Sequence, residues 1–101
     1  MKTIEDSGIV SCHSNNGHTQ TILLEENKVL YKIKIHVESY TFQSYARLYV
    51  LNTNKEWTLL HSLDPQDFGL TNFYSPFPSN KFKDIINALK KTMKKINSII
   101  N

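Results

Sequence analysis

Cysteine, glycine and proline are all scarce in this sequence. Among its 101 residues there are one cysteine, three glycines and three prolines. The single cysteine, Cys12, cannot form an internal disulfide or build a cysteine-ligated zinc site, which is consistent with a reducing compartment. With so few glycines there is no glycine-rich phosphate loop, and no nucleophile elbow is present.

Long hydrophobic runs are also missing. No apolar run approaches the roughly 20 residues that span a bilayer. Residues 1–21 lack the basic start and the apolar centre of a secretory signal. We therefore expect a cytoplasmic protein that does not contact a membrane.

The overall composition is that of one globular domain. Hydrophobic residues make up 40% of the chain, charged residues 21% and aromatic residues 11%. This balance argues against disorder, and 101 residues are too few for two independent cores. We expect a single domain over residues 1–101.

Charge is distributed unevenly along the chain. Residues 1–80 hold six Lys or Arg against eight Asp or Glu, whereas residues 81–101 hold six Lys against Asp84 alone. The first part therefore carries −2 and the second +5, within a total of +3. A cationic segment attached to a mildly acidic body can bind an acidic partner, nucleic acid or the body itself.

Alternating apolar and polar residues predict strands through the centre of the chain. The clearest case is residues 28–37, and the pattern recurs over 42–51 and 56–63. Short turns join these segments, so neighbouring strands must be antiparallel. The apolar positions of the first segment are Val29, Tyr31, Ile33, Ile35 and Val37.

A weaker hairpin precedes these strands, with Asn16 and Gly17 in its turn. Residues 1–7 are either a frayed start or a weak edge strand. Residues 8–63 thus predict a β-meander of about five strands.

A helical stripe marks the end of the chain. Its spacings of three and four residues place the apolar side chains within one face, which predicts an amphipathic helix over residues 80–100. We expect the helix to pack on one face of the sheet and give an α+β fold. Its lysines spread over the polar arc, which is typical of a solvated face. The apolar stripe consists of Phe82, Ile85, Ile86, Leu89, Met93, Ile96 and Ile100.

Residues 64–79 connect the sheet to the helix and are rich in aromatic side chains. The simpler interpretation is a connector that closes the open end of the core. The alternative is an exposed aromatic segment, in which Phe73 and Tyr74 contact a partner.

Sites for chemistry are sparse. His13 and His18 would face each other if the first hairpin closed with a four-residue loop, but two ordinary surface histidines explain them better. We predict no metal site and no cofactor. A domain this thin offers little depth for a pocket of about 300 Å³ or more, and no carboxylate pair is placed by pattern in a cleft, so we do not expect an enzyme.

The solvent face of the two best strands mixes cations with rings. It includes Lys32 and Lys34 on one strand and Tyr45, Arg47 and Tyr49 on the next. Single-stranded nucleic acid is bound by such surfaces, but strand propensity alone also favours tyrosine and lysine there. Leu30, Leu51 and Leu60 are expected near this surface, where they would need cover.

Two functions follow as hypotheses. The first is a small non-catalytic binding protein that acts by protein–protein contact, as an inhibitor or adaptor of the kind that mobile elements carry, or as a homodimer. Its predicted partner-binding residues are Lys32, Lys34, Tyr45, Arg47, Tyr49, Phe73 and Tyr74. The alternative is a single-stranded nucleic-acid-binding domain that uses the same basic and aromatic surface.

Overall fold

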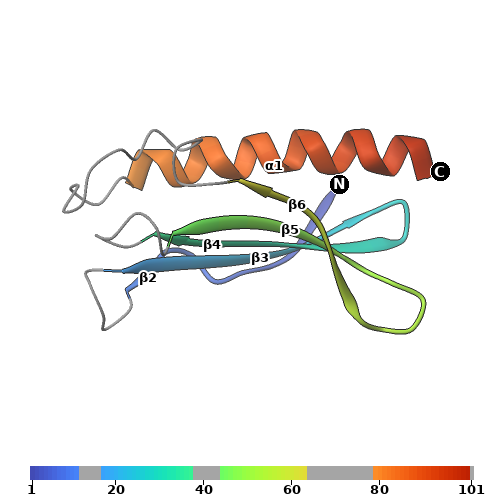
Figure 1. The fold of residues 1–101 in the computed structure, drawn as a ribbon, viewed down its shortest axis with the longest axis horizontal. Helices are drawn as coiled ribbons and strands as arrows, with labels where there is room; N and C mark the ends of the chain where they lie inside the picture. Colours follow the sequence, from blue (N-terminus) through green and yellow to red (C-terminus); the bar gives the residue numbers. More distant parts are fainter. Residues whose placement is uncertain (12–16, 38–43, 64–78, 101) are drawn as a thin grey trace.

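The computed structural model describes residues 1–11, 17–37, 44–63 and 79–100. Six strands are followed by one helix of 22 residues (Figure 1). The elements are β1 Lys2–Asp6, β2 Val10–Ser11, β3 His18–Glu26, β4 Val29–Val37, β5 Tyr45–Leu51, β6 Trp57–Leu63 and α1 Ser79–Ile100. The predicted connector, residues 64–79, lies almost wholly outside this description.

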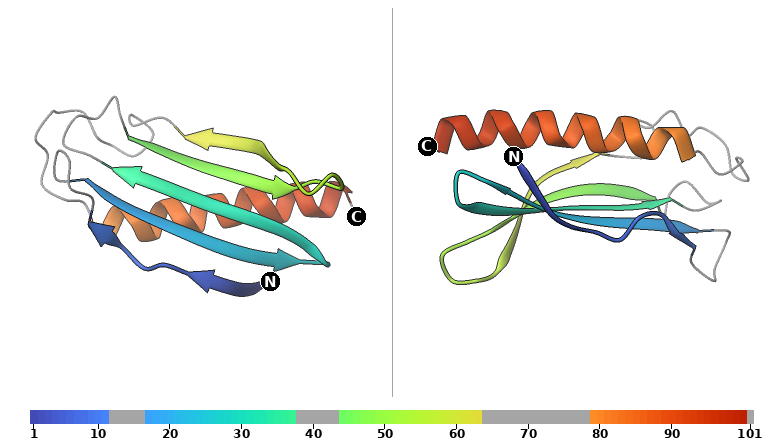
Figure 2. Two further views of the ribbon diagram at one scale, coloured as in Figure 1. Left: turned by 90° about the horizontal axis from the view of Figure 1, so that it is seen from below. Right: turned by 180° about the vertical axis from the view of Figure 1, so that it is seen from behind.

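All strand pairs in the sheet are antiparallel, in the order β1-β3-β4-β5-β6. The short strand β2 pairs with β3 beyond the end of β1. Strands β2 to β6, each paired with the next along the chain, form the predicted meander of about five strands, and α1 lies along one face of the sheet (Figure 2). The predicted α+β architecture is therefore confirmed.

Strands β1 and β2 make one interrupted edge. Gly8 lies between them with a φ of 67°, a conformation that glycine adopts without a Cβ clash. Asp6 Oδ1 accepts hydrogen bonds from Gly8 N and Gln20 Nε2, both at 2.8 Å. The start of the chain is thus an edge strand held onto β3. The first hairpin is present as the β2–β3 pair, and its turn, residues 12–16, is outside the described part.

The β3–β4 hairpin closes through a two-residue turn. Asn27 and Lys28 have φ values of 50° and 68°, and Glu26 pairs directly with Val29. Two consecutive positive φ angles are what a type I′ turn requires, and this turn matches the twist of the flanking strands. The turn keeps the nine-residue ladder between β3 and β4 in a single register.

The core lies between α1 and the inner face of the sheet. Side chains at alternate positions of β3, β4 and β5 point toward α1, and the predicted helical stripe points back at them. Ile86 and Ile96 pack against this core from its margin. Its buried members are Ile22, Leu24, Tyr31, Ile33, Ile35, Val37, Ala46, Leu48, Phe82, Ile85, Leu89 and Met93.

Strand β6 departs from the predicted alternation. Leu48 pairs with His61 but Tyr49 pairs with Leu59, so Leu60 is an extra residue in a β-bulge. The bulge turns Leu60 toward the core, whereas Leu59 shares the outer face with Tyr49. The prediction that Leu60 lies near the outer face is therefore wrong.

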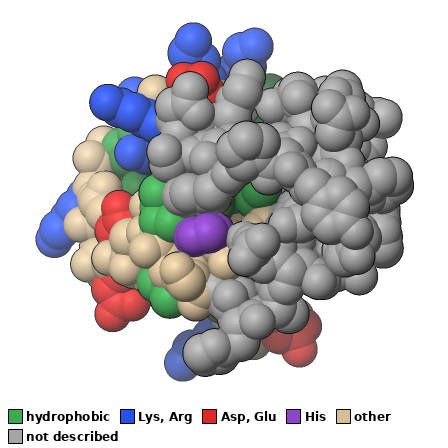
Figure 3. Space-filling model, turned by 90° about the vertical axis from the view of Figure 1, so that its left-hand side faces the viewer, with side chains coloured by type: hydrophobic (Ala, Val, Ile, Leu, Met, Phe, Trp, Pro, Cys, Tyr) green, Lys and Arg blue, Asp and Glu red, His purple; other side chains and the backbone are tan. Residues whose placement is uncertain are grey.

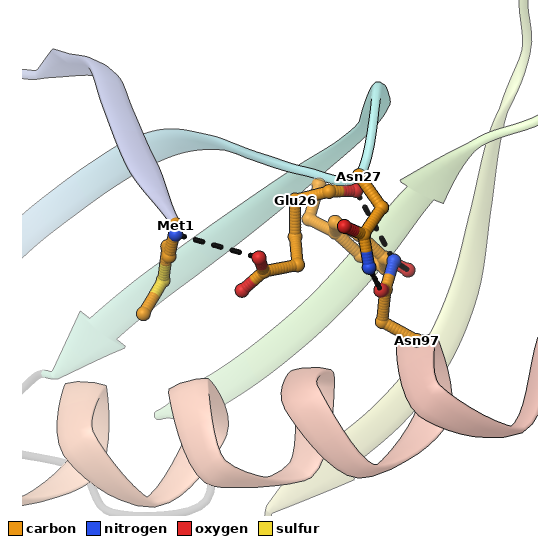
Figure 4. A network of polar contacts seen from close by, with 5 residues as sticks. Met1, Glu26, Asn27 and Asn97 are labelled. Carbon is orange, nitrogen blue, oxygen red and sulfur yellow. Dashed lines mark hydrogen bonds and ion pairs between the residues drawn. The ribbon is translucent and has the colours of Figure 1, made fainter. Parts of the chain in front are cut away.

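One polar cluster joins α1 to the β3–β4 hairpin (Figure 4). Asn97 is 2% exposed, and its Nδ2 donates to Tyr31 Oη at 2.8 Å and to the Glu26 carbonyl at 3.2 Å. Its Oδ1 accepts from Asn27 Nδ2. The Met1 amine lies 3.4 Å from Glu26 Oε1 beside this cluster. Both donors and the acceptor of the buried amide are thus used, so the helix is tied to one place on the sheet.

Within the described residues, no helix combines the length and the apolar character needed to cross a membrane.

Replacing Asn97 with alanine should lower the free energy of unfolding by roughly 1–3 kcal/mol, because Tyr31 Oη and the Glu26 carbonyl lose a buried partner. Urea denaturation followed by circular dichroism measures the loss. Asn87→Ala is the matched control, since Asn87 is exposed on the same helix and should change the stability by no more than about 0.5 kcal/mol. Equal effects of the two changes would show that the amide cluster does not hold the helix.

Candidate functional site

The outer face of the sheet, on the side away from α1, is organised in rows that cross several strands. Residues that pair across neighbouring strands share a face. The register gives one row that crosses the whole sheet from β1 to β6, and two shorter rows beside it. The long row is Glu5, Leu23, Lys32, Tyr49 and Leu59; the next is Thr21, Lys34, Arg47 and Ser62; the third is Thr19, His36 and Tyr45.

Cations and rings contact each other throughout these rows. Lys32 Nζ lies 5.0 Å from the Tyr49 ring centroid and 4.6 Å from that of Trp57. The Arg47 guanidinium lies 4.1 Å from the Tyr45 ring centroid. These distances are within the range of cation–π attraction. Lys32 and Arg47, which make these contacts, are only partly exposed.

His36 contributes a second ring beside Tyr45. The two rings stack at 5.4 Å between centroids, with an angle of 23° between their planes. Offset stacking of this kind is a favourable aromatic geometry. Tyr45 therefore contacts both Arg47 and His36, which restricts its position on the surface.

Lys34 and Arg47 are placed directly opposite each other on β4 and β5. Like charges in this position destabilise a sheet. Within the described residues the only ion pair joins the Met1 amine to Glu26, so neither cation has a carboxylate partner there. The centre of the outer face thus holds an uncompensated positive charge.

The outer face is hollowed into an open trough of about 620 Å³. Its lining comes from both edges of the sheet, with Trp57 on β6 and Glu5 to Ser7 on the β1 side. In a flat sheet these edges would be about 19 Å apart, so the sheet must curve toward its outer side. Figure 1 shows the cause, because the β5–β6 turn lies on the side of the sheet away from α1. The floor of the trough is formed by Thr21, Leu23 and Lys32.

This depression contradicts the expectation that the domain is too thin for a pocket of about 300 Å³. The expectation assumed a flat sheet under a helix, whereas the twisted β6 strand brings Trp57 over Lys32, two strands away. Trp57 is 37% exposed and Leu59 51% exposed. Reasoning from the sequence left both out of the predicted site, because the bulge at Leu60 changes which residues of β6 share the outer face.

The structure brings five of the seven predicted partner-binding residues onto one surface. These are Lys32, Lys34, Tyr45, Arg47 and Tyr49, which lie side by side on β4 and β5. Phe73 and Tyr74 lie outside the described residues, as do Cys12 and His13. His18 pairs with Ser11 across the β2–β3 hairpin.

The side chains of this surface can interact with anionic and with apolar groups. Ammonium and guanidinium groups attract anionic groups, and the rings of Tyr49 and Trp57 offer apolar area with a polar edge. No group of three or more His, Cys, Asp and Glu side chains suited to a metal occurs in the described part of the chain. The Asp6 carboxylate on the rim already accepts the two hydrogen bonds that hold β1 to β3.

Comparisons with protein-family models, with curated proteins and with solved structures find no match for this chain.

The like-charged pair gives a prediction about stability. Lys34→Glu should raise the free energy of unfolding by about 0.5–1 kcal/mol, because a repulsive pair with Arg47 becomes an attractive one. Urea denaturation at low ionic strength measures the gain, and added salt should reduce it. Lys55→Glu, in the exposed β5–β6 turn, makes the same change in net charge and should leave the stability nearly unchanged. A destabilised Lys34→Glu variant would show that the lysine side chain supports the fold and that its repulsion from Arg47 is negligible.

Proposed function

We propose that this chain is a non-catalytic binding protein that contacts another protein through the outer face of its sheet. The observation that carries the proposal is the Lys34–Arg47 pair, an uncompensated positive centre on a surface that also exposes Trp57 and Leu59. A surface that keeps like charges together and exposes large apolar side chains gains by covering both. An inhibitor or adaptor role fits such a surface.

The charge pattern supports a partner with an acidic patch next to an apolar one. The basic residues occupy the middle strands, whereas Glu5 stands at the β1 end of the long row. A partner must therefore place its acidic groups over β4 and β5 and keep them away from β1. Such an arrangement fixes the orientation of binding as well as the partner.

The curvature of the surface supports a convex partner. A trough lined by both sheet edges accepts an inserted loop or helix. Two copies of a concave face leave a void between them when they meet, which lowers the packing density at the interface. The shape therefore favours a different protein over a homodimer formed through this face.

The protein-contact proposal predicts which changes abolish binding. Arg47→Glu and Tyr49→Ala should each remove a protein that copurifies with the wild-type chain, since central charged and aromatic residues dominate interface energies. The copurified protein is purified and its binding to each variant is measured by calorimetry. Lys95→Glu, on the exposed side of α1, alters the net charge as Arg47→Glu does and should retain the partner.

A large drop in melting temperature for Tyr49→Ala would contradict the proposal, even if the variant also loses the partner. Tyr49 would then support the fold and not the interface. Full retention of the partner by Arg47→Glu would exclude the outer face as the binding surface.

A second candidate function is supported by the interleaving of rings and cations. Tyr45, Tyr49 and Trp57 lie beside Lys32 and Arg47. Single-stranded nucleic acid uses rings for its bases and cations for its phosphates. The contacts that already cover these rings count against it, because a base must displace a cation or use the opposite ring face.

The fluorescence of Trp57 tests the nucleic-acid alternative, because Trp57 is the only tryptophan in the chain. If the alternative holds, a thymidine oligomer of about 20 nucleotides should quench the emission at low salt. Replacing Lys32 or Arg47 with alanine should then reduce the slope of log affinity against log salt by about 0.7 for each phosphate that the variant no longer neutralises. Unchanged emission at saturating oligomer would remove nucleic acid as a ligand of this face.

A further inference from the structure

A second basic surface lies on the opposite side of the molecule, on one flank of α1. A groove of about 390 Å³ runs there between the helix and the start of β1. Its lining is formed by Met1, Asn87, Lys90, Lys91 and Lys94. Spacings of three and four residues bring the four helical residues onto adjacent turns of one flank. The groove therefore gathers lysines that the sequence pattern had suggested were spread evenly.

The lining of the groove is positively charged. It includes three lysine ammonium groups and no carboxylate. Glu26 is paired with the Met1 amine at 3.4 Å, and the exposed Asp84 lies on α1 one turn before Asn87, outside the lining. Lys90 and Lys94 are four residues apart, and like charges at this spacing destabilise a helix. Viewed from one end of the molecule, several Lys and Arg side chains lie at the top, on the side of α1, with an Asp or Glu side chain among them (Figure 3).

The helix dipole does not account for these lysines. Cations near a helix C-terminus are stabilised by the macrodipole, but the effect falls off within the last turn. The last turn of α1 carries no basic residue. The position of the lysines therefore needs another explanation, and their convergence on a concave surface points to a ligand.

We infer that this groove binds a compact anion that carries several phosphate groups. Lysine ammonium groups act as point charges that suit phosphate oxygens, and the Asn87 amide supplies a neutral donor beside them. The volume falls within the range of small-molecule sites. The phosphate chain of a nucleotide and free inorganic polyphosphate share this chemistry. The site is separate from the outer face and does not depend on the function proposed for it.

Calorimetric titration of the full chain with sodium tripolyphosphate tests the inference. The wild-type chain should bind one tripolyphosphate with an affinity that falls as salt is added. The triple variant Lys90→Gln, Lys91→Gln and Lys94→Gln should bind at least about tenfold more weakly. Circular dichroism checks that the variant keeps its helix, which glutamine supports nearly as well as lysine.

A matched variant tests whether tripolyphosphate binding depends on the groove or on the net charge of the chain. Lys2→Gln, Lys28→Gln and Lys55→Gln together remove the same charge at exposed positions that belong neither to the groove nor to the proposed binding surface. This variant should bind tripolyphosphate within about twofold of the wild type. Equal losses in the two triple variants would overturn the inference, because the binding would then follow the total charge.

Titrations with ATP and with an oligonucleotide identify the source of the phosphate. ATP that binds more tightly than tripolyphosphate indicates a nucleotide, and equal affinities indicate that the phosphate chain alone is recognised; either result supports the site. Trp57 emission should stay constant throughout, since Trp57 is on the outer face. Absence of tripolyphosphate binding, or binding only of an oligonucleotide at the lysines, overturns the inference.

Discussion

The packing of α1 against the inner face of the sheet is the interaction on which the rest of this structure depends. Burial of large apolar side chains in this layer, each stabilising by about 1.5–3 kcal/mol, supplies most of the favourable free energy of folding. The same packing covers one face of every strand from β3 to β5. Among the described residues, the outer face of the sheet and the exposed side of α1 remain open to other molecules, and both carry basic residues.

Asn97 makes this packing specific. Apolar side chains alone permit a helix to slide or rotate by small steps on a sheet, because such contacts have no direction. A buried amide has fixed donors and one acceptor, and Asn97 finds partners for them in the β3–β4 hairpin. The type I′ turn at Asn27 and Lys28 presents one of those partners. Backbone turn geometry and helix position are thus coupled through one side chain.

Most of this architecture could be predicted from the sequence, because periodicity reports which face of an element is buried. The alternation in residues 29–37 and the apolar stripe in residues 82–96 both correspond to enclosed side chains. The bulge at Leu60 could not be predicted, since a single inserted residue changes the hydrogen-bond register without a distinctive composition. Asn97 can be recognised in the sequence as an unusual position, because it is a polar residue among the apolar positions of the helical stripe.

The candidate site was predictable only in part, for a geometric reason. Alternation along β4 and β5 assigns Lys32, Lys34, Arg47 and the tyrosines to one face, which the register confirms. It gives no information on how strongly the sheet curves. Curvature arises from twist summed over several strands and from the bulge in β6, so it depends on pairings between distant residues. The trough, and the place of Trp57 above Lys32, follow from that curvature.

Stability and the proposed function make opposite demands on the outer face. A surface selected only for stability would place an acidic residue opposite Arg47, as cross-strand pairing favours. The chain instead keeps Lys34 there, while Lys32 and Arg47 are stabilised by cation–π contacts with Tyr45, Tyr49 and Trp57. Under the proposed function, these contacts hold the rings and cations in place before a partner binds, which would reduce the entropy lost on binding. The contacts that stabilise the free surface would then also prepare it for recognition.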